Sequence, residues 1–289
     1  MTSLKDRQRA AARAKLEREM AMRQEQAVHR RRTRTWYTVA AIAVVVVAGI
    51  TIAIINSGGG PAPKATAAPA DVPAKCTWTP NPDPSASPSP APNKYLVKTG
   101  TPPTTDIPNQ GTRTMTLTSS LGTITVALNL SKAPCASESM TFLAGKNFYN
   151  NTDCGNLVST GPYVLLCGDP SDNGEGGPNY SYTPENLPAA GARPNYEMGD
   201  VVMLNNGAGN GSQFMFVYKD TPVQTNPSTG AESSVIPSNY TVVGTVLSGM
   251  DIVQKVAAAG AKPADATGGS APKLPIKFTS VTVGPVASS

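Results

Sequence analysis

A run of twenty residues without a charge, Trp36–Ile55, separates a basic N-terminal segment from the rest of the 289-residue chain. As a helix it would span about 30 Å, the thickness of the hydrocarbon core of a bilayer. The 35 residues before it exceed the short basic lead of a cleaved signal peptide. We therefore expect residues 36–56 to form an uncleaved transmembrane anchor rather than a buried core helix.

The charges beside this run predict its orientation. Four arginines lie within the six residues that precede it, and basic residues favour the cytoplasmic side of a membrane. The expectation is a single-pass protein of the cell membrane, with a cytoplasmic N-terminus and residues 57–289 outside. Residues 1–35 have a helix-forming composition. This tail either only sets the topology or also binds a membrane surface or a partner.

The basic charge is confined to this tail. Residues 1–35 hold eleven Lys and Arg against four Asp and Glu, a net charge of +7, so the rest of the +5 chain carries −2. A negative remainder does not suit a nucleic-acid binder, and we expect no nucleic-acid partner.

Histidine and cysteine usage exclude several kinds of chemistry. The one histidine, His29, lies in the tail, so the rest of the chain has no imidazole for nucleophilic or metal-dependent catalysis. The four cysteines show no C-x-x-C spacing, which disfavours a zinc site. We expect neither a metal nor a cofactor.

Residues 57–111 form a predicted linker. Thirteen prolines in these 55 residues favour an extended chain without a packed core. The short apolar segment Cys76–Trp78 interrupts this composition, and we expect it to dock on the folded domain.

Residues 112–289 are predicted to fold as one mainly β domain. Apolar residues alternate through 115–128, which indicates two strands joined by a turn. Pro134 suits the first turn of a helix, and a second helix is expected near residues 250–258. Many short strands with two helices indicate an antiparallel β-barrel. Further strands are expected at 163–167, 201–204, 213–218, 241–247 and 276–283.

Several blocks in this domain occur together in a recognisable order: LGTITVALNLSKAPCASESMTFLA, CGDPSDNGEGGPNYSYTPEN, GDVVMLNNGAGNGSQFMFVY and NYTVVGTVLSGMDIVQKV. The domain thereby resembles the cyclophilin-type peptidyl-prolyl cis-trans isomerases, above all the membrane-anchored actinobacterial forms. The resemblance implies a closed eight-stranded antiparallel β-barrel capped by two helices. It also implies an isomerase that acts on proline-containing polypeptides.

That family needs no acid or base, because it lowers the barrier of about 18–20 kcal/mol to X–Pro rotation by binding the twisted amide. The resemblance places Gln213 at the substrate-binding glutamine, and Asn205 at an asparagine whose backbone binds the peptide. The resemblance also predicts a proline pocket lined by Val164, Met203, Met215, Ile236 and Tyr240. For the apolar residues among these five, the alternative interpretation is that they belong to the ordinary core of the barrel.

One position departs from the family pattern. Asn156, in Cys154-Gly155-Asn156, stands where the family has its catalytic arginine, and Leu166 stands where relatives place a supporting glutamine. Arg193 is the one conceivable substitute. The hypothesis is a cell-envelope isomerase of reduced activity that assists the folding of exported proteins. The alternatives are a non-catalytic prolyl-peptide binding module or chaperone and, less favoured, a tethered interaction protein.

Four cysteines allow three disulfide pairings. A hairpin between Cys154 and Cys167 would bring these two together, which favours that bond and leaves Cys76 to pair with Cys135. Oxidised cysteines agree with the expected position outside the membrane.

Overall fold

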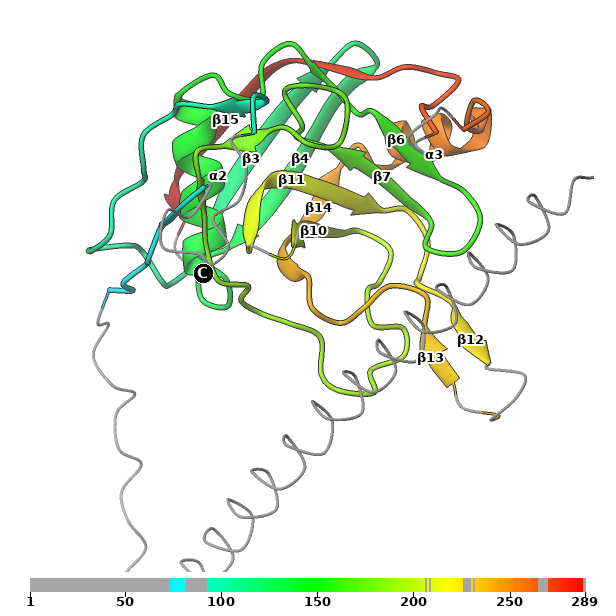
Figure 1. Ribbon diagram of the computed structural model, residues 1–289, viewed down its shortest axis with the longest axis horizontal. Helices are drawn as coiled ribbons and strands as arrows, with labels where there is room; N and C mark the ends of the chain where they lie inside the picture. The colour runs from blue at the N-terminus through cyan, green and yellow to red at the C-terminus, as the bar shows by residue number, and fades with distance from the viewer. Residues whose placement is uncertain are drawn as a thin grey trace, which may run out of the picture. The chain divides into compact units, whose positions relative to one another are not determined.

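The computed structural model describes residues 73–81, 93–205, 207, 209–225, 230, 232–264 and 270–287 (Figure 1). The predicted tail and the predicted anchor at residues 36–56 lie outside these ranges. Within them, no helix is both long and apolar enough to cross a membrane.

In the part of the chain that the structure describes, the main sheet contains nine strands, all paired antiparallel, in the order β5-β15-β3-β4-β14-β10-β11-β7-β6. Eight strands were expected from the resemblance; the additional one arises because the short segments β5 and β6 pair with different neighbours. The strands are β3 (Thr112–Ser119), β4 (Gly122–Asn129), β5 (Thr152–Asp153), β6 (Asn156–Val158), β7 (Val164–Cys167), β10 (Asp200–Asn205), β11 (Asn210–Val217), β14 (Thr241–Ser248) and β15 (Lys277–Ala287).

The two edges of this sheet are β5 and β6, and only Cys154 and Gly155 separate them in the chain. The sheet is therefore curled into a half-barrel, and this link joins its two edge strands, which do not pair with each other as the expected closed barrel would require. A disulfide between Cys154 and Cys167, with 4.1 Å between the Cα atoms, ties the link to the end of β7. The structure confirms the favoured pairing of these cysteines.

The interior of the curled sheet is filled by alternate residues of the strands, as a period of two requires. Phe214 and Phe216 of β11 point inward, and Phe214 stacks on Phe278 of β15 at a centroid distance of 6.3 Å. The helices α2 (Pro134–Gly145) and α3 (Met250–Ala259) lie at opposite ends of the sheet (Figure 1). Within the described ranges, the mainly β fold with two helices agrees with the expectation.

Pro134 begins α2, as its sequence position predicts, but the cap of this helix comes from far along the chain. Ala133 provides no side-chain cap. Instead the Glu185 carboxylate accepts hydrogen bonds from the backbone N–H groups of Cys135 (3.3 Å) and Ala136 (3.0 Å). Burial raises the pKa of this carboxyl, although the two backbone bonds act in the opposite direction.

Part of the predicted linker packs on the domain. We call residues 73–81 and 93–97 the strap. It contains β1 (Thr79–Pro80), which pairs antiparallel with β9 (Tyr180–Ser181), and β2 (Leu96–Val97), which pairs parallel with β8 (Gly177–Pro178). A second disulfide, Cys76–Cys135, joins the strap to α2 with 5.6 Å between the Cα atoms.

Trp78 is the apolar anchor of the strap. Its ring makes edge contacts with Tyr180 and Tyr182, both at 5.4 Å between centroids, and its indole N–H donates to the Pro103 carbonyl at 2.9 Å. The segment Cys76–Trp78 therefore docks as expected, and residues 93–97 and Ile107, which is buried in the core, pack on the domain as well.

Candidate functional site

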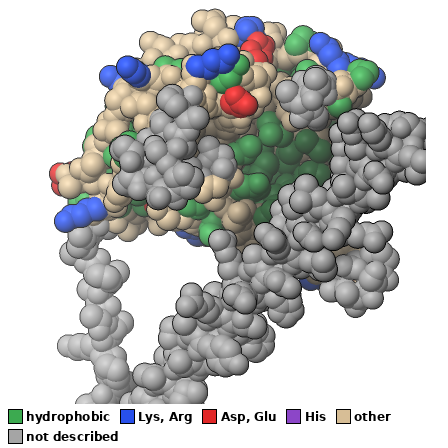
Figure 2. Space-filling model, in the orientation of Figure 1, with side chains coloured by type: hydrophobic (Ala, Val, Ile, Leu, Met, Phe, Trp, Pro, Cys, Tyr) green, Lys and Arg blue, Asp and Glu red, His purple; other side chains and the backbone are tan. Residues whose placement is uncertain are grey.

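The outer face of strands β6, β7, β10 and β11 carries a second group of apolar side chains, separate from the interior core. Strand alternation explains it, because residues that flank each inward side chain point outward. Figure 2 shows hydrophobic side chains gathered in a hollow over β7, β10 and β11. The buried members, which we call the outer-face cluster, are Val164, Tyr196, Val202, Met215, Val217 and Ile236.

Asn156 belongs to the same face. The strand register aligns Val202, Met215, Leu166 and Asn156 in one cross-strand row. Neighbouring strands are about 4.8 Å apart, so Asn156 lies roughly 10 Å from Met215, with Leu166 between them. The structure therefore brings the position that resembles the family's arginine to the edge of the outer-face cluster.

The Asn156 side chain is engaged by a neighbouring segment. Its Oδ1 accepts a hydrogen bond from the backbone N–H of Ser270 at 3.2 Å, and the Leu157 N–H donates to the Ser270 carbonyl at 2.8 Å. These contacts fix the Asn156 amide, which carries no charge, against Ser270 at the edge of the sheet.

The structure groups most of the apolar residues that the sequence singled out. Val164, Met215 and Ile236 are buried in the outer-face cluster, and Tyr240 packs against it half-buried. Met203 is the exception. It lies in the interior core, because Val202 and Leu204 on either side of it take the outer face.

Tyr196 is a member of the cluster that the sequence analysis does not find. Its hydroxyl accepts a hydrogen bond from the Tyr240 N–H at 3.1 Å and donates to the Pro237 carbonyl at 3.0 Å. Burial raises the pKa of Tyr196 to about 12. Tyr196 thus holds the segment that carries Ile236 and Tyr240 against the sheet, and it lies in a loop without a sequence pattern that would reveal this role.

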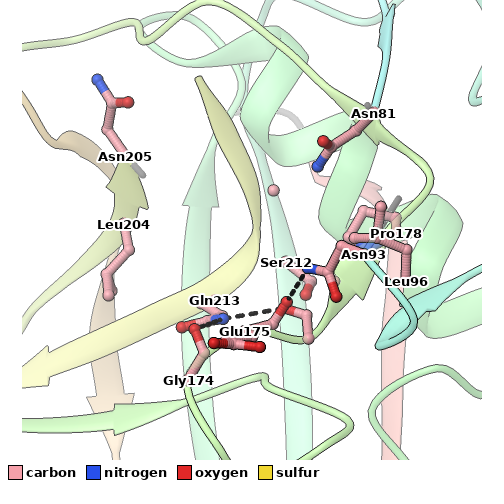
Figure 3. A pocket seen from close by; sticks show the side chains of 13 residues that line it. Asn81, Asn93, Leu96, Gly174, Glu175, Pro178, Leu204, Asn205, Ser212 and Gln213 are labelled. Carbon is pink, nitrogen blue, oxygen red and sulfur yellow. Dashed lines mark hydrogen bonds between the residues drawn. The ribbon is translucent and has the colours of Figure 1, made fainter. Parts of the chain in front are cut away.

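Gln213 lies two residues before Met215 on β11 and faces the same side. Its Nε2 donates to the carbonyl oxygens of Gly174 and Gly176, both at 2.9 Å. Beside it is a cavity of about 200 Å³. In Figure 3, Leu204 and Asn205 of β10 lie across this cavity from residues of the strap.

The loop that receives Gln213 is itself held by Asp169. One carboxylate oxygen of Asp169 accepts hydrogen bonds from the Ser171 N–H and hydroxyl, at 2.8 and 2.7 Å, and the other accepts from the Gly174 N–H. Gly176 passes so close to this carboxylate that a Cβ atom would collide with it. The GDP-x₃-GEGG sequence therefore shapes the loop that meets Gln213.

Neither arginine of the folded domain stands beside Asn156 in the sheet. Arg193 forms an ion pair with Glu232 of β13 (Glu232–Ser234), and its Nη2 donates to the Glu232 carbonyl at 2.9 Å. Arg113 is on β3, four strands from β11 in the sheet order. β13 and β12 (Val223–Thr225) form a separate hairpin that projects from the domain (Figure 1).

Other polar groups do not suggest metal or acid–base chemistry. Burial raises the pKa of Asp172, and the neighbouring carboxylates of Asp153 and Asp169 add to the effect. Across the described ranges, no three His, Cys, Asp or Glu side chains come together as a possible metal site. The arrangement consists instead of an apolar hollow with amide groups along its rim, which suits the binding of an extended peptide.

Comparison with known proteins identifies the family. The family model described as cyclophilin type peptidyl-prolyl cis-trans isomerase/CLD matches residues 114–283, which is more than half of the chain. The chain belongs to the cyclophilin family. The matched range contains the outer-face cluster, Asn156 and Gln213, and the strap precedes it.

Curated relatives of this cyclophilin include mycobacterial proteins named "Probable peptidyl-prolyl cis-trans isomerase B". The protein of Mycobacterium leprae is 35% identical over 150 residues, covering 48% of this chain and 46% of that protein. The protein of Mycobacterium tuberculosis is 34% identical over 151 residues, covering 48% of this chain and 44% of that protein. The chain thus matches less than half the length of these relatives.

A peptidyl-prolyl cis-trans isomerase of Dictyostelium discoideum is 30% identical over 151 residues, which cover 50% of this chain and 84% of that protein. Among solved structures, a cyclophilin type isomerase of Cryptosporidium parvum has a TM-score of 0.45 and 19% identity, covering 61% of this chain and 99% of that one.

Proposed function

We propose that this cyclophilin binds proline-containing polypeptides on the outer face of β6, β7, β10 and β11, and that it isomerises X–Pro bonds slowly. The observation that carries the proposal is the cross-strand row in which Asn156 stands beside Leu166 and Met215. The outer-face cluster supplies an apolar pocket for a prolyl ring. Gln213 and Asn205 lie along the same side for the neighbouring peptide groups.

The reduced activity follows from the chemistry of Asn156. Twisting an X–Pro amide localises a lone pair on the prolyl nitrogen, and a donor aimed there stabilises the transition state selectively. A neutral amide is a donor of about half the strength of a guanidinium, and the bond that Oδ1 of Asn156 accepts from the Ser270 N–H fixes the orientation of the amide. The apolar pocket can therefore still bind the proline ring, while Asn156 stabilises the twisted amide of the transition state only weakly.

A non-catalytic prolyl-peptide binding module is the second candidate. Asn156 favours this candidate too, because a site that lacks a cationic donor still has all the apolar contacts that hold a proline ring. The two candidates differ in turnover and agree in binding.

Binding should depend on the aromatic side chain at the rim of the pocket. Replacing Tyr240 by alanine is expected to weaken the affinity for an Ala-Ala-Pro-Phe peptide about three- to tenfold, because one aromatic contact contributes about 0.5–1.5 kcal/mol. Isothermal titration with the full chain measures it. Leu247→Ala, at a side chain that is 61% exposed on β14 and outside the cluster, is the matched control. Unchanged affinity in Tyr240→Ala would place the peptide elsewhere.

For the whole chain we infer a place in the cell envelope, with residues 36–56 as the anchor and exported polypeptides as substrates. The uncharged run and the arginines before it support this inference. The full chain should pellet with membranes, and protease added outside intact cells or spheroplasts should degrade residues 57–289. A variant without residues 1–56 should remain in the supernatant. Full-length protein in the soluble fraction, or protection from external protease, would contradict the inference.

A further inference from the structure

The strap reaches the peptide-binding side of the domain. Of the residues that line the cavity beside Gln213, three come from the strap: Asn81, Asn93 and Leu96. Figure 3 shows them opposite Leu204 and Asn205, with Gln213 between the two sides. One wall of this cavity is therefore built from residues that precede the range matched by the family.

The strap is held in place by backbone pairing as well as by its disulfide. Leu96 and Val97 align with Gly177 and Pro178, and the Asn179 N–H donates to the Val97 carbonyl at 3.0 Å. The Thr99 N–H in turn donates to the Asn179 side chain at 2.9 Å. These bonds fix the segment that follows Asn93 directly beside the loop at 174–176.

Asn93 uses both ends of its side-chain amide. Its Oδ1 accepts from the Tyr95 N–H at 2.9 Å, which shapes the turn that leads into β2. Its Nδ2 donates to the Glu175 carbonyl at 2.9 Å. One side chain therefore connects the strap to the loop that Gln213 contacts.

Asn93 and Gln213 together bind three consecutive carbonyl groups of this loop. Gln213 binds the carbonyl oxygens of Gly174 and Gly176, and Asn93 binds the one between them, on Glu175. Gly174 has a left-handed backbone, with a φ of 85°, and the side chain at 175 is exposed. The Asp169 carboxylate holds the N–H side of this loop at Gly174, and the bonds from Asn93 and Gln213 hold its carbonyl side.

We propose that Asn93 is a positioning residue of the peptide-binding site: it holds the loop at 174–176, and through that loop it sets the orientation of the Gln213 amide. The strap is then part of the site rather than a passive connection. The inference rests on the proposed function for the role of Gln213 in peptide binding, but the coupling between Asn93 and Gln213 can be measured without any peptide.

The first measurement is hydrogen exchange of the Gln213 side-chain amide, followed by NMR on the full chain. Asn93→Ala should accelerate this exchange several-fold, because the carbonyl groups that accept the Gln213 protons become mobile. Asn93 is exposed, so the variant should remain folded. Lys94→Ala is the matched control, since Lys94 lies in the same turn and its ammonium packs on Tyr95 instead of the loop.

The second measurement is a double-mutant cycle on the affinity for an Ala-Ala-Pro-Phe peptide. Asn93→Ala should weaken binding about threefold and Gln213→Ala about tenfold, and the double variant should bind about as weakly as Gln213→Ala alone. Losses that multiply to about thirtyfold would mean that Asn93 acts independently of Gln213, and would overturn the inference.

The two measurements separate the inference from the function beneath it. A wild-type chain that binds no prolyl peptide contradicts the proposed function, while accelerated exchange in Asn93→Ala still supports the coupling. Exchange at Gln213 that is equal in Asn93→Ala, Lys94→Ala and the wild type overturns the positioning role of Asn93, whatever the peptide affinity.

Discussion

Replacing Asn156 by arginine is expected to raise the isomerase activity of the chain about tenfold, because a charge-assisted hydrogen bond contributes roughly 1.5 kcal/mol more than a neutral one. Asn156 begins β6 in the row that continues through Leu166 to Met215. An arginine there is long enough to extend over Leu166 towards the prolyl pocket. A protease-coupled assay with a prolyl peptide measures the change in kcat/KM.

The matched control is Asn156→Gln. This variant also loses the bond to the Ser270 N–H that Asn156 accepts, and it lengthens the side chain without adding a charge. Its activity should stay near that of the wild type. If Asn156→Arg binds the peptide normally and turns it over no faster than Asn156→Gln does, a missing cation does not limit the turnover of this chain.

Trp78→Ala is expected to cause the largest loss of stability. Truncation of a buried tryptophan typically costs about 3–5 kcal/mol, and Trp78 packs on Tyr180 and Tyr182 with its indole N–H bonded to Pro103. For a domain of this size, the loss corresponds to a decrease of roughly 10 °C in Tm. Thermal unfolding of the full chain, followed by circular dichroism, measures it.

Trp78→Phe separates the two contributions. It keeps an aromatic ring against the tyrosines and loses the hydrogen bond to Pro103, so about 1 kcal/mol should be lost. Equal Tm values for Trp78→Ala and the wild type would show that the strap detaches without effect on the domain. In that case limited proteolysis should cut the strap in the variant alone.

Strand periodicity accounts for much of what the sequence predicts. The alternation through residues 115–128 corresponds to β3 and β4, and the same period places Met215 and Gln213 on one face of β11. The hairpin between Cys154 and Cys167 follows from local chain reversal. These features depend on residues that are close in sequence, where patterns are informative.

The remaining features depend on contacts between distant segments. Strand β2 is only two residues long, Leu96–Val97, so it is too short for a periodic pattern that would reveal its pairing with β8. Glu185 caps α2 from about 50 positions away. Tyr196 joins the outer-face cluster from a loop. The predicted pocket position of Met203 was wrong for another reason. A shift of one residue along a strand moves a side chain to the opposite face, and Met203 lies on the inner face.

The central claim is that this cyclophilin binds prolyl peptides and isomerises them slowly. NMR exchange spectroscopy on one sample, with wild-type full chain and an Ala-Ala-Pro-Phe peptide, tests both parts together. We predict that signals of Gln213, Met215 and Tyr240 shift on titration, and that the cis–trans exchange of the peptide becomes faster than the uncatalysed time of roughly 10–100 s but stays slower than about one event per second. Exchange at the uncatalysed time would favour the non-catalytic binding module. Exchange accelerated to many events per second, or titration without shifts at these three residues, would contradict the account.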